Sequence, residues 1–470
     1  MNIDEEKIAK IVKAVVAEMG DTPKRHQIGV FDTMEEALAA VNKAYTQFRS
    51  YNKEQRESIL KEIRRLTHEE AEIMAKLAVE DTKMGNVYHK TLKHHLVADK
   101  TPGTEDLEVR ALSGDKGLTL VEMAPYGIIG AITPSTNPSC TVICNSISML
   151  AGGNGVVFNP HPHAKRISAY AVDLVNRAVL AAGGPENIVV TVANPTMDTS
   201  NMMVNDPSVR MLVATGGPGV VKMLLSSGKK AIGAGAGNPP VVFDDTADIQ
   251  KAAKDIIDGC TFDNNLPCIA EKECFVMANV ADELIAGMQK HGAYLINAEQ
   301  VKQLEKVVLV EKPGKDGKPS SLVINKDWVG RDAKKILAQI GVNVGDEVRC
   351  IICETEFSQA FVQTELMMPI LAIVRCRTFE EAMEMAVKAE HGNRHSAHLH
   401  SKNVDHMTAY AKAVCTTIFV KNAPSYAGIG FGSEGHTTFT IAGPTGEGIT
   451  SARSFTRQRR CVLVDSLSII

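Results

Sequence analysis

Apolar and polar positions divide this chain of 470 residues into a short leading segment and a long body. In residues 1–19, apolar side chains recur at helical spacing, which predicts an amphipathic helix with one apolar stripe. The stripe consists of Ile8, Ile11, Val12, Val15 and Met19. A polar linker is predicted for residues 20–28. A short tethered helix buries its stripe by docking on its own body or on another protein, and a frayed terminus is the alternative.

The body, from about residue 29, alternates helical patterns with short apolar runs. Thr33-x-x-Glu36 predicts a capping box that opens a helix through Phe48, and further helices are expected over residues 53–83. Between residues 127 and 244, four βα units are predicted, which indicates a parallel sheet. The strands are 127–133, 155–159, 188–192 and 209–214, and the helices are 138–150, 164–181, 196–204 and 219–226.

Two further stretches complete the α/β fold class. The extended runs 107–113 and 118–123 flank Gly114-Asp115-Lys116-Gly117, which predicts a β-hairpin. A second α/β stretch covers residues 244–433 and includes a capped helix at Thr378-x-x-Glu381. The tail carries one more strand signal, at residues 461–465.

Composition narrows the class of protein. The net charge is −4, so there is no basic surplus for nucleic acid, and no apolar run reaches the ~18 residues of a membrane span. Ten cysteines without a regular rhythm, and no apolar leader, predict reduced thiols in the cytoplasm. Cys350-x-x-Cys353 lies in a strand-like run and has no second pair, which disfavours zinc, and no metal is predicted.

Candidate chemistry centres on Cys268, at the end of the polar turn Thr261-Phe262-Asp263-Asn264-Asn265-Leu266-Pro267. A predicted helix, 249–260, precedes this turn and an apolar run, 274–277, follows it, so Cys268 lies at an element end, where catalytic groups concentrate. A thiol becomes a strong nucleophile when it ionises. A buried, inert cysteine is the alternative.

Two glycine-rich loops have different contexts. Thr215-Gly216-Gly217-Pro218-Gly219 follows a strand and opens a helix, where backbone N–H groups and the helix dipole can bind a pyrophosphate. Residues 233–240 resemble half a dinucleotide fingerprint, but a strand follows them instead of a helix. A plain tight loop is the alternative for both.

Several motifs together resemble the aldehyde dehydrogenase superfamily in order and spacing, from about residue 29 onwards. They are Pro134-Ser135-Thr136-Asn137-Pro138, Thr215-Gly216-Gly217, residues 235–239, Cys268 and Glu365-Leu366-Met367-Met368-Pro369. A second set resembles the CoA-acylating propionaldehyde and acetaldehyde dehydrogenases of bacterial microcompartments. It comprises residues 262–268 and 233–240, Phe419-Val420-Lys421-Asn422 and Thr445-Gly446-Glu447-Gly448. The leading helix resembles the encapsulation peptide of these enzymes.

The resemblance implies an aldehyde dehydrogenase fold in three parts. A Rossmann-like domain for NAD and CoA would comprise residues 29–106 and 126–240, and a catalytic domain residues 241–444. Residues 107–125 and 445–470 would form a β-hairpin oligomerisation flap. The resemblance also implies a homodimer or homotetramer in the microcompartment lumen, with residues 1–19 contacting a shell protein.

The resemblance also assigns roles in the site. Cys268 is the nucleophile, and the Asn137 amide and the Cys268 N–H stabilise the oxyanion, although Asn137 alone would be interpreted as a turn residue. Glu365 would hold the nicotinamide ribose, with a solvated acid as the alternative. The other implied NAD contacts are Thr133, Pro134, Ser135, Asn159, His161, Thr215, Gly216 and Gly217. Hydrolytic relatives have Lys-Pro where this chain has Asn159-Pro160, so His161 is either a nucleotide contact or a loop residue.

The expected acceptor of the acyl group is inferred from the absence of a glutamate in the 233–240 loop. Hydrolytic aldehyde dehydrogenases carry a Glu about two residues before the Gly-Gly of the 233–240 loop, but here Gly233-Ala234 precede Gly235. Water attacks a thioester slowly without a general base, whereas a thiol is already partly ionised. The expected reaction is NAD-dependent oxidation of a short aldehyde, propanal rather than acetaldehyde, to its acyl-CoA. Phosphate as the acceptor stays open, and a non-catalytic cargo or adaptor protein is the remote alternative.

Three histidines of the C-terminal third, His391, His395 and His436, lie within possible reach of the acyl pocket. They are expected to be non-catalytic.

Overall fold

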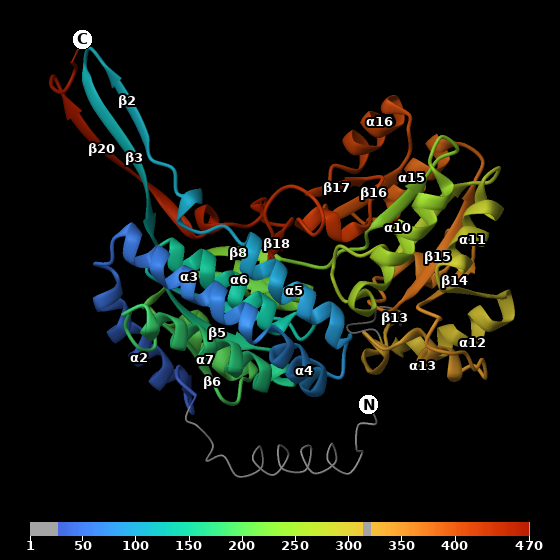
Figure 1. The fold of residues 1–470 in the computed structure, drawn as a ribbon, viewed down its shortest axis with the longest axis horizontal. Coiled ribbons are helices and arrows are strands. Elements are labelled where there is room, and N and C mark those ends of the chain that lie inside the picture. Colours follow the sequence, from blue (N-terminus) through green and yellow to red (C-terminus); the bar gives the residue numbers. More distant parts are fainter. Residues whose placement is uncertain (1–26, 314–320, 470) are drawn as a thin grey trace, which may run out of the picture.

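The computed structural model describes residues 27–313 and 321–469. The predicted leading helix lies outside the described residues, as does most of the linker. Figure 1 shows two α/β bodies side by side and an arm of three strands that projects from the first body. Among the described helices, none is long and apolar enough to cross a membrane.

The first body contains a six-stranded parallel sheet in the order β1-β6-β5-β4-β7-β8. The four predicted strands and the four helices between and after them are confirmed, with ends shifted by a few residues. The strands are β1 Val30–Phe31, β4 Ile128–Thr133, β5 Gly155–Pro160, β6 Val189–Val192, β7 Val209–Thr215 and β8 Lys230–Ala234. The helices that follow β4 to β7 are α6 Pro138–Ala151, α7 Lys165–Ala181, α8 Met197–Asn205 and α9 Pro218–Leu225.

The strand order of this sheet contains a topological switch point. From β4 the chain continues to β5 and β6 on one side, and then crosses to β7 and β8 on the other side. Ligands of open α/β sheets bind outside the carboxyl ends of the strands at such a switch point. The segments after β4 and β7 therefore border the position where a ligand is expected.

Helices from the start of the chain pack on this body. The capping box predicted for Thr33 and Glu36 is confirmed, with both reciprocal hydrogen bonds formed. The helices are α2 Met34–Phe48, α3 Lys53–Glu69, α4 Ala71–Thr82 and α5 Val87–Lys100. The sequence pattern did not predict α5, because its buried face includes Lys90, Lys93 and His94 beside its apolar residues.

The second body contains a seven-stranded parallel sheet in the order β11-β14-β15-β10-β9-β16-β17. Its strands are β9 Pro240–Phe243, β10 Glu273–Met277, β11 Ala293–Ile296, β14 Cys350–Glu354, β15 Ile370–Cys376, β16 Ser396–His400 and β17 Ile418–Lys421. Its longer helices are α10 Ile249–Thr261, α11 Ala281–Lys290, α12 Ala298–Val308, α15 Phe379–Ala389 and α16 Val404–Val414. The predicted cap of α15 by Thr378 is confirmed.

The side chains of Cys350 and Cys353 lie on opposite faces of the sheet. Cys350 packs into the apolar core on one face of β14 and Cys353 into the core on the other face. Residues three apart on a strand point to opposite faces, so these two thiols do not converge on one ion. Within the described ranges, no group of three or more potential ligands is arranged around a metal position.

The arm is a three-stranded antiparallel sheet. The predicted hairpin is confirmed as β2 Arg110–Gly114 and β3 Gly117–Pro125. The predicted tail strand is longer than expected: β20 Thr456–Val464 pairs with the whole of β3. Figure 1 shows the arm reaching away from both bodies.

Candidate active site

The turn before Cys268 has an uncommon backbone. Asp263, Asn264 and Asn265 have φ values of 48°, 56° and 66°, so three successive residues with side chains occupy the left-handed region. This region is unfavourable for L-residues, and Asp and Asn tolerate it best. Such a turn persists only where the surrounding structure holds it.

Asp263 is the first anchor of this turn. Its carboxylate is fully buried and forms ion pairs with Lys90 and Lys93 of α5, and it accepts a hydrogen bond of 2.9 Å from the Asn86 N–H. Burial opposes ionisation of Asp263, but the two ammonium groups outweigh it and hold the pKa of the carboxyl below its ordinary value. The packing is tight, because a Cβ on Gly85 would lie 2.1 Å from Asp263 Oδ1.

Asn265 and Lys272 form the second anchor. The Asn265 amide donates to the Cys260 carbonyl at 2.8 Å and to the Glu271 carbonyl at 2.9 Å. The buried Lys272 ammonium donates back to Asn265 Oδ1 at 2.6 Å. The chain segment that carries Cys268 is therefore braced on both sides of the thiol.

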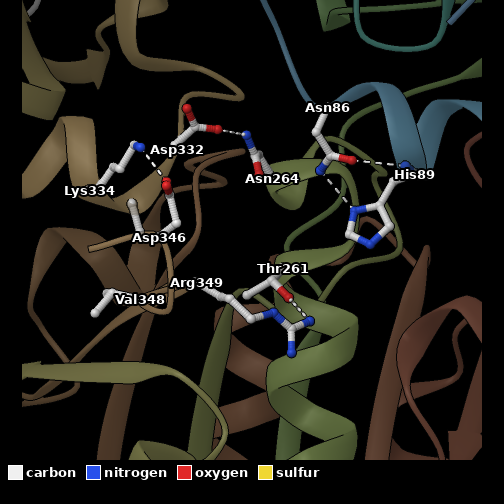
Figure 2. Close-up of a pocket in the computed structure, with 10 residues that line it drawn as sticks. Asn86, His89, Thr261, Asn264, Asp332, Lys334, Asp346, Val348 and Arg349 are labelled. Carbon is white, nitrogen blue, oxygen red and sulfur yellow. Dashed lines mark hydrogen bonds and ion pairs between the residues drawn. The ribbon is translucent and has the colours of Figure 1, made fainter. Parts of the chain in front are cut away.

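A small polar pocket lies against the same turn (Figure 2). Asn264 reaches into it and donates to Asp332 at 2.9 Å, while Arg349 donates to Thr261 at 2.8 Å. Among the described residues that line the pocket, none is a predicted site residue. Because its polar groups bond one another, we interpret this pocket as support for the turn rather than as the reaction site.

Cys268 itself is half-buried, in the segment between α10 and β10. Burial and the nearby Glu365 carboxylate raise the pKa of the Cys268 thiol to about 12, while Lys272 and Lys93 lower it. A Cβ on Gly237 would lie 3.0 Å from the Cys268 carbonyl oxygen, so the 233–240 loop touches the nucleophile segment. The resting Cys268 side chain is therefore a protonated thiol, and the charged groups near it act on its pKa in both directions.

Asn137 begins helix α6 and is 9% exposed. Its Oδ1 accepts a short hydrogen bond from the Lys93 ammonium. An ammonium group only donates, so the amide oxygen must face Lys93 and the amide NH₂ must point elsewhere. Since Lys93 also acts on the Cys268 thiol, Asn137 and Cys268 share one neighbourhood.

Glu365 is half-buried next to the nucleophile. Burial raises the pKa of Glu365 to about 7, although the Lys272 ammonium and the Gly237 backbone oppose this rise. Cys268 and Glu365 therefore interact electrostatically, and Lys93, which bonds Asn137, also acts on the Cys268 thiol.

The remaining predicted residues lie at the carboxyl edge of the first sheet. Thr133 ends β4 and Thr215 ends β7, and Pro134-Ser135 and Gly216-Gly217 follow these strands on the two sides of the switch point. At Gly216, Gly217 and Gly219, a Cβ would meet nothing within 4 Å, so the backbone at the start of α9 is approachable. Thr133 Oγ1 is buried with no hydrogen-bond partner among the described residues. These features fit a dinucleotide with its pyrophosphate at α9.

Asn159 and His161 are engaged by the protein itself. The Asn159 amide donates to Ser200 Oγ at 2.7 Å and accepts from Thr199 Oγ1 at 2.7 Å, which ties β5 to α8. The His161 ring accepts from the His163 N–H at 3.2 Å, and burial lowers its pKa. His161 is half-buried. It lies next to the end of β4, because its backbone N–H donates to the Thr133 carbonyl at 3.0 Å.

Several groups that shape the site were not predicted from the sequence. Lys90 and Lys93 lie on the unpredicted helix α5, and Asp263 and Lys272 were not singled out. Of the three histidines, His395 is buried against Gly237, whereas His391 and His436 are exposed. Lys90 and Lys93 are three residues apart, and on a helix that starts after Asn86 this spacing places both side chains on one face. This spacing is the one signal for the two lysines that the sequence offered.

Comparison with known proteins agrees with this geometry. The model of the "Aldehyde dehydrogenase family" matches residues 6–307. The acetylating acetaldehyde dehydrogenase EutE of Salmonella typhimurium is 46% identical over 475 residues, with both chains covered completely. A propionaldehyde dehydrogenase from the fucose utilisation microcompartment of Clostridium phytofermentans is 57% identical, with a TM-score of 0.91, over 94% of this chain and 100% of that one.

A third relative shows the chemistry in its crystal structure. The propionaldehyde dehydrogenase of Rhodopseudomonas palustris, with bound CoA and an acylated cysteine, is 51% identical with a TM-score of 0.90. The alignment covers 94% of this chain and 99% of that one. The family model and the full-length relatives lead to one conclusion: this chain belongs to the aldehyde dehydrogenase family.

Proposed function

We propose that this protein is an NAD-dependent, CoA-acylating aldehyde dehydrogenase that works through a thioacyl intermediate on Cys268. The observation that carries the proposal is the shared neighbourhood of the Cys268 thiol, the Glu365 carboxylate and the Asn137 amide, held together by Lys93 and Lys272. The relatives described above support the reaction class.

The first half of the reaction forms the thioester. The ionised Cys268 sulfur adds to the aldehyde carbon, and the carbonyl oxygen takes up the negative charge. The Asn137 amide and the Cys268 N–H donate hydrogen bonds to this oxygen. NAD would be held by residues 133–135, residues 215–217 and Glu365, and would supply the hydride acceptor. Loss of the hydride leaves the acyl group on Cys268 as a thioester.

In the second half, the acyl group moves to CoA. The CoA thiolate adds to the thioester carbonyl, the Cys268 sulfur leaves as thiolate, and acyl-CoA is released. The 233–237 segment beside Cys268 contains no carboxylate that would activate water. This favours CoA over water as the acceptor, and the CoA bound to the R. palustris relative supports the same choice.

The aldehyde is short and aliphatic, and we favour propanal. The relatives named above act on acetaldehyde or propionaldehyde. Rates of NADH formation with each aldehyde, at matched enzyme concentration, decide between the two.

The CoA requirement tests the function. With aldehyde and NAD, we expect sustained NADH formation only when CoA is present, and at most one equivalent per active site without it. Cys268→Ala abolishes both signals, whereas Cys415→Ser, at an exposed thiol outside the site, keeps them. Sustained turnover without CoA would contradict the proposal.

The proposed assembly is a homodimer or homotetramer in the lumen of a microcompartment. The exposed arm supplies a surface for self-association, and a relative comes from such a compartment. Residues 1–19 are proposed to dock on a shell protein. Co-purification of shells with the full chain, but not with a chain that starts at Gly29, checks this docking.

A further inference from the structure

We propose that Lys93 is a positioning residue that fixes both halves of the oxyanion site at once. This inference rests on the proposed function, in which the Asn137 amide and the Cys268 N–H bind the developing oxyanion. The two donors come from different elements, the start of α6 and the loop before β10. Their spacing must be kept within a fraction of an ångström for both to act on one oxygen.

The Lys93 ammonium bonds the supports of both donors directly. It donates to Asn137 Oδ1 and to Asp263 Oδ2, and Asp263 is the first anchor of the left-handed turn that leads to Cys268. Lys93 is 1% exposed and Asp263 is 0% exposed, so solvent does not compete for these bonds. A single group on α5 therefore couples the α6 donor to the Cys268 loop.

The contact also decides the orientation of the amide. The two ends of an Asn amide have nearly the same shape, so packing alone does not distinguish them. With Lys93 on one side, the flipped amide would direct its NH₂ at an ammonium group, and that orientation is excluded. The NH₂ is thus committed to the opposite side as a hydrogen-bond donor.

Charge adds to the effect. The buried cluster sets two lysines, Lys90 and Lys93, against one carboxylate, Asp263, and burial lowers the pKa of Lys90. Lys93 lowers the pKa of Cys268 and favours the thiolate. The same field favours an oxyanion on the bound aldehyde, because both anions form at this place.

Lys90 provides a matched control. It lies one helical turn before Lys93, pairs with the same Asp263 oxygen at 3.0 Å and is equally buried, but its other contact is the Thr136 carbonyl at 3.5 Å. It does not bond Asn137. Loss of packing is thus similar for the two lysines, while the amide contact is particular to Lys93.

A double-mutant cycle tests the proposal. We expect Lys93→Met to lower kcat about 10- to 100-fold with little change in the KM for NAD, and Lys90→Met to lower it clearly less. In the Asn137→Ala background, the loss caused by Lys93→Met should be clearly smaller, because the amide contact is gone and only the contact with Asp263 and the charge near the thiol remain. Equal losses for the two lysines, or an unchanged loss in the Asn137→Ala background, would overturn the proposal.

Two further measurements separate positioning from folding. The rate of iodoacetamide alkylation of Cys268 should shift to higher pH in Lys93→Met, because a positive charge near the thiol is lost. Asn137→Asp keeps the oxygen that faces Lys93, so it should match the wild-type melting temperature yet lose activity. Failure of Asn137→Asp to fold would also count against the assigned orientation. Wild-type CoA-dependent turnover, measured in parallel, shows separately whether the proposed function itself holds.

Discussion

At the scale of single residues, burial and nearby charges of opposite sign determine the protonation state of Cys268. Burial and Glu365 stabilise the thiol, while Lys272 and Lys93 stabilise the thiolate, and the net pKa of about 12 keeps the resting sulfur protonated. Below this pKa, the thiolate fraction grows about tenfold for each pH unit. The alkylation rate of Cys268 in the free enzyme should therefore still be rising with pH at pH 9.

The Glu365→Gln variant separates two roles of one carboxylate. Removing the negative charge stabilises the thiolate, so the pKa of Cys268 falls and its alkylation at pH 8 should become several-fold faster. NADH formation should fall about tenfold or more, because a charged hydrogen bond to the ribose is lost. Glu356→Gln, the same change at an exposed site, should alter neither rate. An unchanged alkylation rate in Glu365→Gln would show that the carboxylate does not act on the sulfur.

At the scale of elements, the arm has unusual surface chemistry. Leu112 of β2 and Val462 of β20 are both aligned with Thr119 of β3, so the three side chains form a row on one face. Leu112 is 53% exposed and Val462 is 56% exposed. Exposed apolar residues on a projecting sheet are typical of an interface with another copy of the chain.

The variant Val462→Asp tests this interface. A carboxylate placed in an apolar contact is costly to desolvate, so the oligomer should dissociate toward monomer in light scattering. Gln458→Asp, with the same new charge on the same strand, is the control. An unchanged mass for Val462→Asp would show that the oligomer, if formed, does not use this row.

The elements that the sequence predicted are those with a regular apolar period. The βα units from β4 to α9 follow the pattern closely because their strands are buried on both faces. Helix α5 was not predicted from the sequence, because lysine is normally solvated, whereas Lys90 and Lys93 lie on the buried face of this helix. Cys268 was singled out by its place at an element end, whereas Asn137 and Glu365 were assigned roles only through a family resemblance, since residue spacing does not reveal which residues the fold brings together.

At the scale of the whole molecule, the site lies where the two bodies join. The segment between β8 of the first sheet and β9 of the second lies at Gly237 against the backbone of Cys268 and near the Glu365 carboxylate. The proposed nucleotide site thus belongs to one sheet and the nucleophile to the other. This arrangement explains why the chemistry needs the complete chain fold rather than either body alone.

The central claim is that one sulfur atom holds the acyl group between oxidation and transfer. Mass spectrometry of the protein incubated with propanal and NAD, without CoA, tests it most directly. We predict one propanoyl group on Cys268, formed with one equivalent of NADH and discharged as propanoyl-CoA when CoA is added. If the complete system turns over but the peptide that contains Cys268 stays unmodified without CoA, the proposed mechanism is wrong.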